Sequence, residues 1–187
     1  MDADLSLVRR TLGGDLGAFE EIVERHRDVV FRVAARIVGP REAEDVSQDA
    51  LLRAFHRLSS FRGEGSFRAW LLQITHHAAV DALARRRDLA DTPAVDAAEE
   101  IDSHATRLPA ERLEERERRE RLELKLTGLT PTHRAVLVLR DLEGLSYDEI
   151  AGITETPLGT VKGRLHRARG ELIELLRANT YDWELPG

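Results

Sequence analysis

The feature that most constrains the fold is the segment 146–176, which reads as a short helix, a tight turn and a long helix. Ser146 and Glu149 have the three-residue spacing of a capping box, which predicts a helix over 147–153. A second helix is predicted from about Leu158. At 100° per residue, one side of it collects apolar residues: Val161, Leu165, Ala168, Leu172 and Leu176. This order of elements is typical of a helix-turn-helix.

The opposite side of the long helix carries small and polar residues, namely Gly159, Thr160, Gly163, His166, Arg167 and Gly170. Each glycine lowers helix stability by roughly 1 kcal/mol relative to alanine, so a surface that keeps three of them favours close approach to a partner such as a DNA groove. Lys162, Arg164 and Arg169 flank this side, where they can reach phosphates, and the helix amino-terminus at 157–160 can offer backbone NH groups to a further phosphate. The alternative interpretation is a surface helix with scattered positive charge.

A further helix is predicted before this motif, beginning at Thr130-Pro131 and ending at Gly144. Its apolar side comprises Ala135, Val136, Leu139 and Leu142.

The first third of the chain predicts two amphipathic helices, over 19–37 and 41–58, separated by Gly39-Pro40. His26 lies on the apolar stripe of the first helix and is interpreted as a structural histidine. In the second helix the residues expected to face inward are Val46, Ala50, Leu51, Ala54, Phe55 and Leu58. Its other side carries Glu44, Asp45, Gln48, Asp49 and Leu52, which suits either a solvated acidic face or docking onto a basic partner.

The segment FRGEGSF (61–67) predicts a loop, with Ser66 as the cap of a third helix. Trp70, Leu71, Ile74 and Ala78 lie on one side of that helix, which ends in three arginines, 85–87. Adjacent helical residues diverge by about 100°, so His76 and His77 do not bind one metal ion. We expect His77 and Asp81, four residues apart, to form a hydrogen-bonded pair instead.

Between these regions, residues 88–120 lose the hydrophobic period and carry 11 acidic against 5 basic residues. Such a composition is typical of a flexible linker. The sequence therefore predicts an all-α chain of two small helical domains, 1–87 and 121–187, joined by the acidic linker 88–120.

Composition excludes several function classes. The chain has no cysteine, so it forms no disulfide and uses no thiolate. No stretch approaches the roughly 18 apolar residues of a membrane span, and MDADLSLVRR lacks the apolar region of a signal peptide. The lack of cysteine removes several enzyme classes at once, and we expect a cytoplasmic protein that is not inserted in a membrane.

Two long motifs, AEDVSQDALLRAFHRLSSFRGEGSFRAWLLQI (43–74) and LSYDEIAGITETPLGTVKGRLHRAR (145–169), together closely resemble bacterial RNA polymerase sigma factors of the extracytoplasmic-function (ECF) type. The resemblance spans roughly residues 15–87 and 122–177. It implies an amino-terminal three- or four-helix domain of the sigma region 2 type and a carboxy-terminal helix-turn-helix of the region 4 type.

The resemblance also implies partners and site residues. The core-polymerase contacts would be Glu44, Asp45, Gln48, Asp49 and Leu52, which dock on the β′ clamp helices, and the β flap would be a second polymerase contact. The promoter −10 contacts, where a flipped base is held, would be Arg62, Gly63, Glu64, Gly65, Ser66, Phe67, Trp70, His76, Arg85, Arg86 and Arg87. The −35 contacts would be Pro157, Leu158, Gly159, Thr160, Lys162, Gly163, Arg164, His166 and Arg167. An anti-sigma factor is a further implied partner. The mechanism that the resemblance implies is binding and remodelling, so the chain is expected not to be an enzyme and to need neither cofactor nor metal.

The chain departs from the family pattern in two places. His76-His77 stands where the family usually has Arg-Asn, and Thr154-Glu155-Thr156 stands in the turn where apolar and small residues are usual. The turn is still expected to form. A stand-alone helix-turn-helix regulator is the alternative function, but the first half lacks the βα alternation of a receiver domain. A metal-dependent enzyme using His76, His77 and Asp81 is a second alternative.

Overall fold

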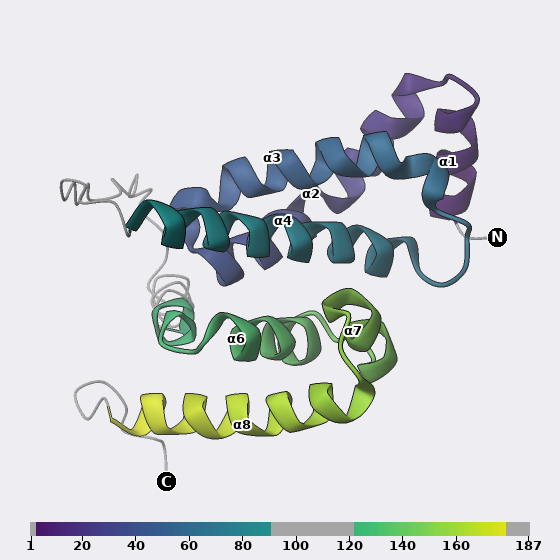
Figure 1. The fold of residues 1–187 in the computed structure, drawn as a ribbon. Coiled ribbons are helices and arrows are strands. Elements are labelled where there is room, and N and C mark those ends of the chain that lie inside the picture. Colours follow the sequence, from purple (N-terminus) through teal and green to yellow (C-terminus); the bar gives the residue numbers. More distant parts are fainter. Residues whose placement is uncertain (1–2, 91–121, 179–187) are drawn as a thin grey trace, which may run out of the picture.

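The computed structural model describes residues 3–90 and 122–178, and all regular structure in these ranges is helical, as predicted (Figure 1). Residues 3–90 form α1 (Ala3–Leu12), α2 (Leu16–Val38), α3 (Pro40–Arg57), the short 3₁₀ helix η1 (Leu58–Ser60) and α4 (Phe67–Ala90). After a helical turn at 122–127 come α6 (Pro131–Leu137), the π-helical η2 (Val138–Leu142), α7 (Tyr147–Thr154) and α8 (Leu158–Arg177).

Local chemistry fixes the ends of the first helices. Asp15 caps α2 by accepting from the amide of Ala18 at 3.2 Å. Gly39 ends α2 with φ of 99°, which glycine adopts without a steric penalty, and Pro40 opens α3. The predicted break at Gly39-Pro40 is therefore confirmed. Ser66 Oγ accepts from the amide of Ala69 at 3.4 Å, which confirms it as the cap of α4.

The core of the first half forms where α2 packs on α3 and α4. Val30, Val33 and Ala34 of α2 are fully buried. Small residues of α3, Ala43 and Ala50 among them, are also fully buried and allow the helices to approach closely.

α1 closes one end of this bundle and was not predicted. Leu7 and Val8 bury its inner side, and Asp4 Oδ2 lies 3.1 Å from Nε2 of His26. His26 is buried beside Phe67, with ring centroids 5.4 Å apart, so the prediction of a structural histidine is confirmed.

In the second half, Thr130 caps α6 by accepting from the amide of His133, and Pro131 is its first residue. Gly144, with φ of 73°, ends the segment, as predicted. The helices α6 and η2 bury a continuous apolar stretch from Ala135 to Leu139.

The two halves pack against each other, which the sequence did not predict (Figure 1). α4 lies against α7, and α2 lies against α6 and η2. The buried Arg134 of α6 donates to the carbonyl of Ile37 at 2.8 Å and to two carbonyls of its own half. Burial lowers the pKa of this guanidinium. The core is therefore continuous from one half to the other.

Most of the predicted linker, 91–120, and the tail with Tyr181 and Trp183 lie outside the described residues. α4 continues to Ala90, so helix extends three residues beyond the predicted boundary at 87. None of the helices in the described ranges combines the length and hydropathy needed to cross a bilayer.

Candidate nucleic-acid interface

The helix-turn-helix begins at a complete capping box. Ser146 Oγ accepts from the amide of Glu149 at 3.2 Å, and Glu149 Oε2 accepts from the amide of Ser146 at 2.8 Å. Two amides that would otherwise lack a partner at the start of α7 are thereby satisfied. Both predicted bonds are confirmed, and α7 keeps a fixed start relative to the preceding loop.

The turn between α7 and α8 forms despite its unusual sequence, as expected. Glu155 adopts the left-handed conformation, φ 51° and ψ 40°, at a cost of about 1–2 kcal/mol for a residue with a side chain. Thr154 Oγ1 donates to the carbonyl of Ile150 at 2.8 Å and lies 2.8 Å from Thr156 Oγ1. These hydroxyl contacts stabilise the turn where an apolar pair is usual.

α8 presents one buried and one open side. Val161, Leu165 and Ala168 are buried, as predicted. On the other side, a Cβ added at Gly159 or Gly170 would meet no atom within 4 Å. Pro157 supplies no side-chain cap to α8, and the amide of Thr160 donates to the Pro157 carbonyl at 2.8 Å. The amides of Leu158 and Gly159 are therefore the ones at this helix start that can donate to a phosphate.

The cationic side chains near α8 differ in whether they form an ion pair within the protein. Lys162 is exposed, with Nζ 5.7 Å from the ring of Tyr147, and Arg167 is also exposed. Arg169 binds both carboxylate oxygens of Asp141, at 2.9 and 2.5 Å, and Asp141 raises the pKa of its guanidinium. Arg169 is paired with Asp141 in this structure while its side chain is 48% exposed, and its expected contact with phosphate stays a prediction.

The outer side of α3 displays the acidic group identified from the sequence. Gln48 Nε2 donates to Glu44 at 2.9 Å, Asp49 pairs with Arg53 at 2.8 Å, and Asp45 is exposed. Leu52 is 61% exposed in their midst.

An apolar groove continues this side of α3. It is lined by Phe19, Val23, Gln48, Leu51, Leu52 and Phe55. Phe55, expected to face inward, is 37% exposed, and its ring packs edge-on against Phe19 with centroids 4.8 Å apart. Phe19 and Val23 were missed as surface candidates because both lie on the apolar stripe of α2.

The loop before α4 is shaped by two glycines with positive φ, Gly63 at 75° and Gly65 at 88°. A Cβ at Gly63 would also lie 2.9 Å from Leu5. The exposed side chains in this loop are those of Arg62, Glu64 and Ser66. At the far end of α4, the exposed side chains are those of Arg85, Arg86 and Arg87.

Phe67 does not belong to this surface. Its side chain is 1% exposed, and its ring lies 5.1 Å from Phe61 and 5.3 Å from Trp70. The expectation that its side chain contacts DNA does not fit the structure, because the first residue of α4 points into the core. Trp70 is partly exposed at the edge of the same aromatic cluster.

The histidines of α4 lie against the second half of the chain. Nδ1 of His76 is buried without a hydrogen-bond partner. Burial lowers the pKa of His76 to about 4, and the nearby charges of His77 and Arg164 act in the same direction. His76 was expected among the −10 contacts, whereas in this structure its ring lies against the second half of the chain.

The predicted pair of His77 with Asp81 is wrong. His77 Nε2 lies 3.4 Å from Glu155, in the helix-turn-helix turn, and Asp81 pairs with Arg53 of α3 at 2.6 Å. The helical spacing was correct, but each side chain meets a closer partner from another element. The described residues contain no cluster of three metal-ligating side chains.

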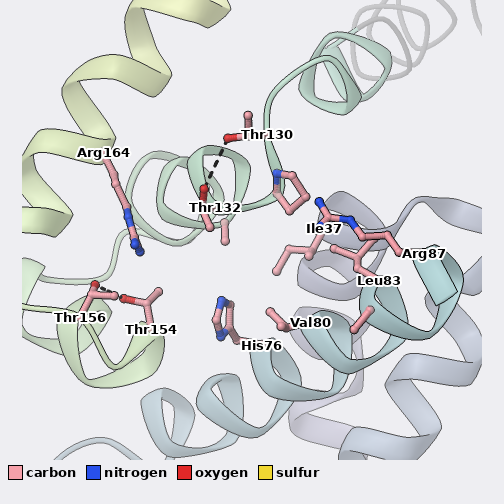
Figure 2. A pocket seen from close by; sticks show the side chains of 13 residues that line it. Ile37, His76, Val80, Leu83, Arg87, Thr130, Thr132, Thr154, Thr156 and Arg164 are labelled. Carbon is pink, nitrogen blue, oxygen red and sulfur yellow. Dashed lines mark hydrogen bonds between the residues drawn. The ribbon is translucent and has the colours of Figure 1, made fainter.

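Beside the contact between α4 and α7, a cavity of about 470 Å³ is lined by residues of both halves. In Figure 2, His76 of α4 and Arg164 of α8 point into this space from opposite sides, with Thr154 and Thr156 of the turn beside them. Candidate −10 and −35 residues thus face each other in this structure.

Comparisons with known proteins agree with this architecture. The chain matches the family models of Sigma-70 region 2 over residues 22–88 and Sigma-70 region 4 over 119–172. It is 34% identical over 172 residues to the ECF RNA polymerase sigma-E factor of Escherichia coli K12, covering 89% of this chain and 90% of that protein. It is 35% identical over 169 residues to the ECF RNA polymerase sigma factor SigE of Mycolicibacterium smegmatis. That match covers 85% of this chain but 62% of the longer relative.

Two solved structures share the fold. CnrH, in complex with the cytosolic domain of CnrY, matches with a TM-score of 0.67 and 31% identity, covering 96% of this chain and 100% of that one. The sigma factor RpoE of Bartonella quintana, in complex with the anti-sigma factor NepR, matches with a TM-score of 0.67 and 24% identity, covering 86% and 98%.

Proposed function

The chain belongs to the ECF RNA polymerase sigma factors, and from this premise we propose which of its surfaces bind polymerase and promoter DNA. Members of this family are non-catalytic initiation factors. This chain would act by binding and remodelling: it recruits core polymerase, positions it on a promoter and helps to open the DNA.

The observation that carries the proposal is that one chain presents two surfaces of opposite chemistry. The outer side of α3 is acidic with an exposed leucine and an apolar groove. The outer side of α8 carries the exposed cations Lys162 and Arg167, and the space at Gly159 and Gly170 is open. An acidic-apolar surface suits a basic protein partner, and a cationic helix in a helix-turn-helix suits a DNA groove.

We assign polymerase docking to Glu44, Asp45, Gln48, Asp49 and Leu52 of α3, and add Phe19, Val23 and Phe55 from the adjoining groove. The partner there would be the β′ clamp helices. The helix-turn-helix half would contact the β flap while α8 reads the −35 element through Lys162, Arg164, Arg167 and the amides at its start.

The −10 element would be opened at the loop before α4. Its two glycines with positive φ leave room for the backbone to approach an unstacked base, and Trp70 offers a partly exposed ring for stacking. Arg85, Arg86 and Arg87 would hold the phosphates. Phe67 is left out because its side chain is buried.

A protein inhibitor of the anti-sigma class is the remaining proposed partner. CnrH, 31% identical to this chain, was solved in complex with the cytosolic domain of another protein. We propose a comparable partner here and a cytoplasmic location, where polymerase and promoters are found. The stand-alone regulator is not favoured, because the region 2 match fills the part of the chain where that class would carry a different domain.

The test is reconstituted transcription. Purified chain is added to core polymerase with a library of promoter sequences, and the transcripts are sequenced. We expect a defined promoter class with paired −10 and −35 elements. Transcript levels equal to those of core enzyme alone, across the whole library, would exclude the proposed function.

A further inference from the structure

The cavity lined by both halves has the size of a small-molecule site. Its volume of about 470 Å³ falls within the roughly 300–1,000 Å³ that is usual for such sites. The residues that line it come from α2, α4 and α6, from the turn between α7 and α8, and from α8 itself. The cavity therefore exists only where the two halves meet, and docking of polymerase on α3 leaves it unfilled.

Contacts beside the cavity fix its walls relative to each other. The Glu143 side chain, which follows η2, is 3% exposed and lies 2.7 Å from Arg68 of α4 and 3.1 Å from Arg36 of α2. Gln73 of α4 also donates to the carbonyl of Gly152 in α7 at 3.2 Å. A buried carboxylate is costly without cationic partners, so these contacts favour one arrangement of the halves.

One wall of the cavity is apolar. It is formed by aliphatic side chains from α2, α4 and α6: Ile37, Val80, Leu83, Ala84, Pro131 and Ala135. Val80 is 45% exposed and Ala84 is exposed as well, although both belong to a helix whose inner side is well packed. Because apolar surface is stabilised by about 25 cal/mol for each Å² removed from water, a ligand with an apolar body would gain from covering this wall.

The opposite end of the cavity is positively charged. Arg164 of α8 points into it beside the threonines of the turn, and Arg87 lies at its edge (Figure 2). No acidic residue of the described ranges lines the cavity, and Arg164 forms no ion pair with a carboxylate of these ranges. Burial, together with the nearby charges of His77 and Arg164, lowers the pKa of His76 to about 4. The ring of His76 is therefore neutral at pH 7, and the charge of Arg164 has no anion to balance it.

We propose that this cavity binds a small amphipathic carboxylate, with its apolar body against α4 and α6 and its carboxylate on Arg164. A guanidinium and a carboxylate match as a bidentate pair. A purely apolar ligand would leave Arg164 without a partner, and a bare inorganic anion would leave the apolar wall in contact with water. Only a ligand that combines both parts satisfies the whole lining.

The occupied cavity has a consequence for DNA binding that rests on the function proposed above. Arg164 is one of the proposed −35 contacts, and a guanidinium paired with a carboxylate is not available to a phosphate at the same time. The ligand therefore competes with the −35 element for Arg164.

The site is tested with sodium octanoate as the probe, without polymerase or DNA. Isothermal titration calorimetry of the full chain at pH 7 should show saturable binding of one octanoate per chain. Octanamide has the same length without the charge, and inorganic phosphate has charge without an apolar body. Each should bind at least about tenfold more weakly than octanoate. Equal binding of octanoate and octanamide would overturn the role of Arg164, and no binding of octanoate would overturn the site.

Two variants assign the binding to the cavity. Arg164→Gln should weaken octanoate at least about tenfold. Ala84→Trp places a large ring in the cavity from an exposed position and should abolish binding. Arg177→Gln is the matched control for Arg164→Gln, because Arg177 lies at the other end of α8 and pairs with Glu174 at 3.2 Å. Parent-like octanoate binding in both cavity variants, with helix content retained by circular dichroism, would refute the assignment.

Methyl-resolved nuclear magnetic resonance locates the bound probe. Octanoate should shift the methyl resonances of Ile37, Val80 and Leu83, which line the cavity. The apolar groove beside α3 serves as the internal comparison, since Val23 and Leu52 line it. Shifts confined to Val23 and Leu52 would place the probe in that groove and overturn the proposal.

Competition is tested with a −35 duplex taken from the promoters that the transcription test selects. Saturating octanoate should weaken binding of this duplex to the parent chain and should have no effect on its binding to Ala84→Trp. Equal duplex affinity with and without octanoate, in a chain that calorimetry shows to bind it, would overturn the competition. A failure of the proposed function leaves the calorimetry and the methyl shifts unchanged, so the two failures are distinguishable.

Discussion

Replacing Phe67 with alanine separates a core role from a DNA-contact role. The side chain is 1% exposed and lies within 5.1–5.4 Å of the rings of Phe61, Trp70 and His26. Burial of a phenylalanine contributes about 1.5–3 kcal/mol, its aromatic contacts about 0.5–1.5 kcal/mol, and the cavity left behind adds to the cost. We therefore expect Phe67→Ala to lower the free energy of unfolding by about 3–5 kcal/mol.

The assay is urea unfolding followed by circular dichroism. With a slope of about 2 kcal/mol per molar urea, the midpoint should fall by about 2 M for a loss of about 4 kcal/mol. Phe31→Ala is the matched control: Phe31 belongs to α2 and is 41% exposed, so its midpoint should move much less.

Phe67→Leu completes the comparison, because it keeps an apolar side chain in the core but removes the flat ring that a base could stack on. It should transcribe nearly as well as the parent at 25 °C. An unchanged midpoint for Phe67→Ala, or a stable Phe67→Leu protein that has lost promoter opening, would refute the assignment of this residue to the core.

Three further predictions concern the proposed surfaces. Asp45→Arg should weaken binding to core polymerase in a pull-down without changing the urea midpoint, while Glu174→Arg, the same charge change on α8, should not; equal affinities would count against the α3 surface. Arg164→Ala should weaken binding to −35 duplexes and reduce the slope of log affinity against log salt by about 0.9, the value of one lost phosphate contact; an unchanged slope would show that Arg164 makes no such contact. Burial lowers the pKa of His76 to about 4, so the folded state favours the neutral ring. The free energy of unfolding should therefore be highest above pH 6.5 and should fall as the pH drops from 6.5 toward 4. His76→Gln should lose less stability than the parent between pH 7 and pH 5, and equal losses would contradict the burial of a neutral ring.

Much of the secondary structure was predictable because its determinants are local. The capping box of Ser146 and Glu149, the break at Gly39-Pro40 and the stop at Gly144 depend on residues within one helical turn of each other. α1 was missed because its ten residues supply only a short inner side, Leu7, Val8 and Thr11, and its place depends on contacts with α2.

The sequence predicted which helices carry the candidate sites, but it predicted the individual residues at those sites less well. Helical periodicity correctly divided α8 into a buried and an open side. It assigned Phe55 inward, although this residue lies at the rim of the bundle where α2 leaves it 37% exposed. The family resemblance placed Phe67 on the −10 surface, although its side chain at the start of α4 is buried in the core.

By itself, then, the sequence determined an all-α chain, its helix ends and a helix-turn-helix with a cationic outer side, because periodicity, capping and turn conformation act over a few residues. The tertiary structure alone decided the partners of Glu143, Arg134, Asp81 and His77. Glu143 meets arginines 75 to 111 residues away. A local sequence pattern does not predict such pairings. They form only when packed helices bring distant charges together and remove the water that would otherwise solvate these charges.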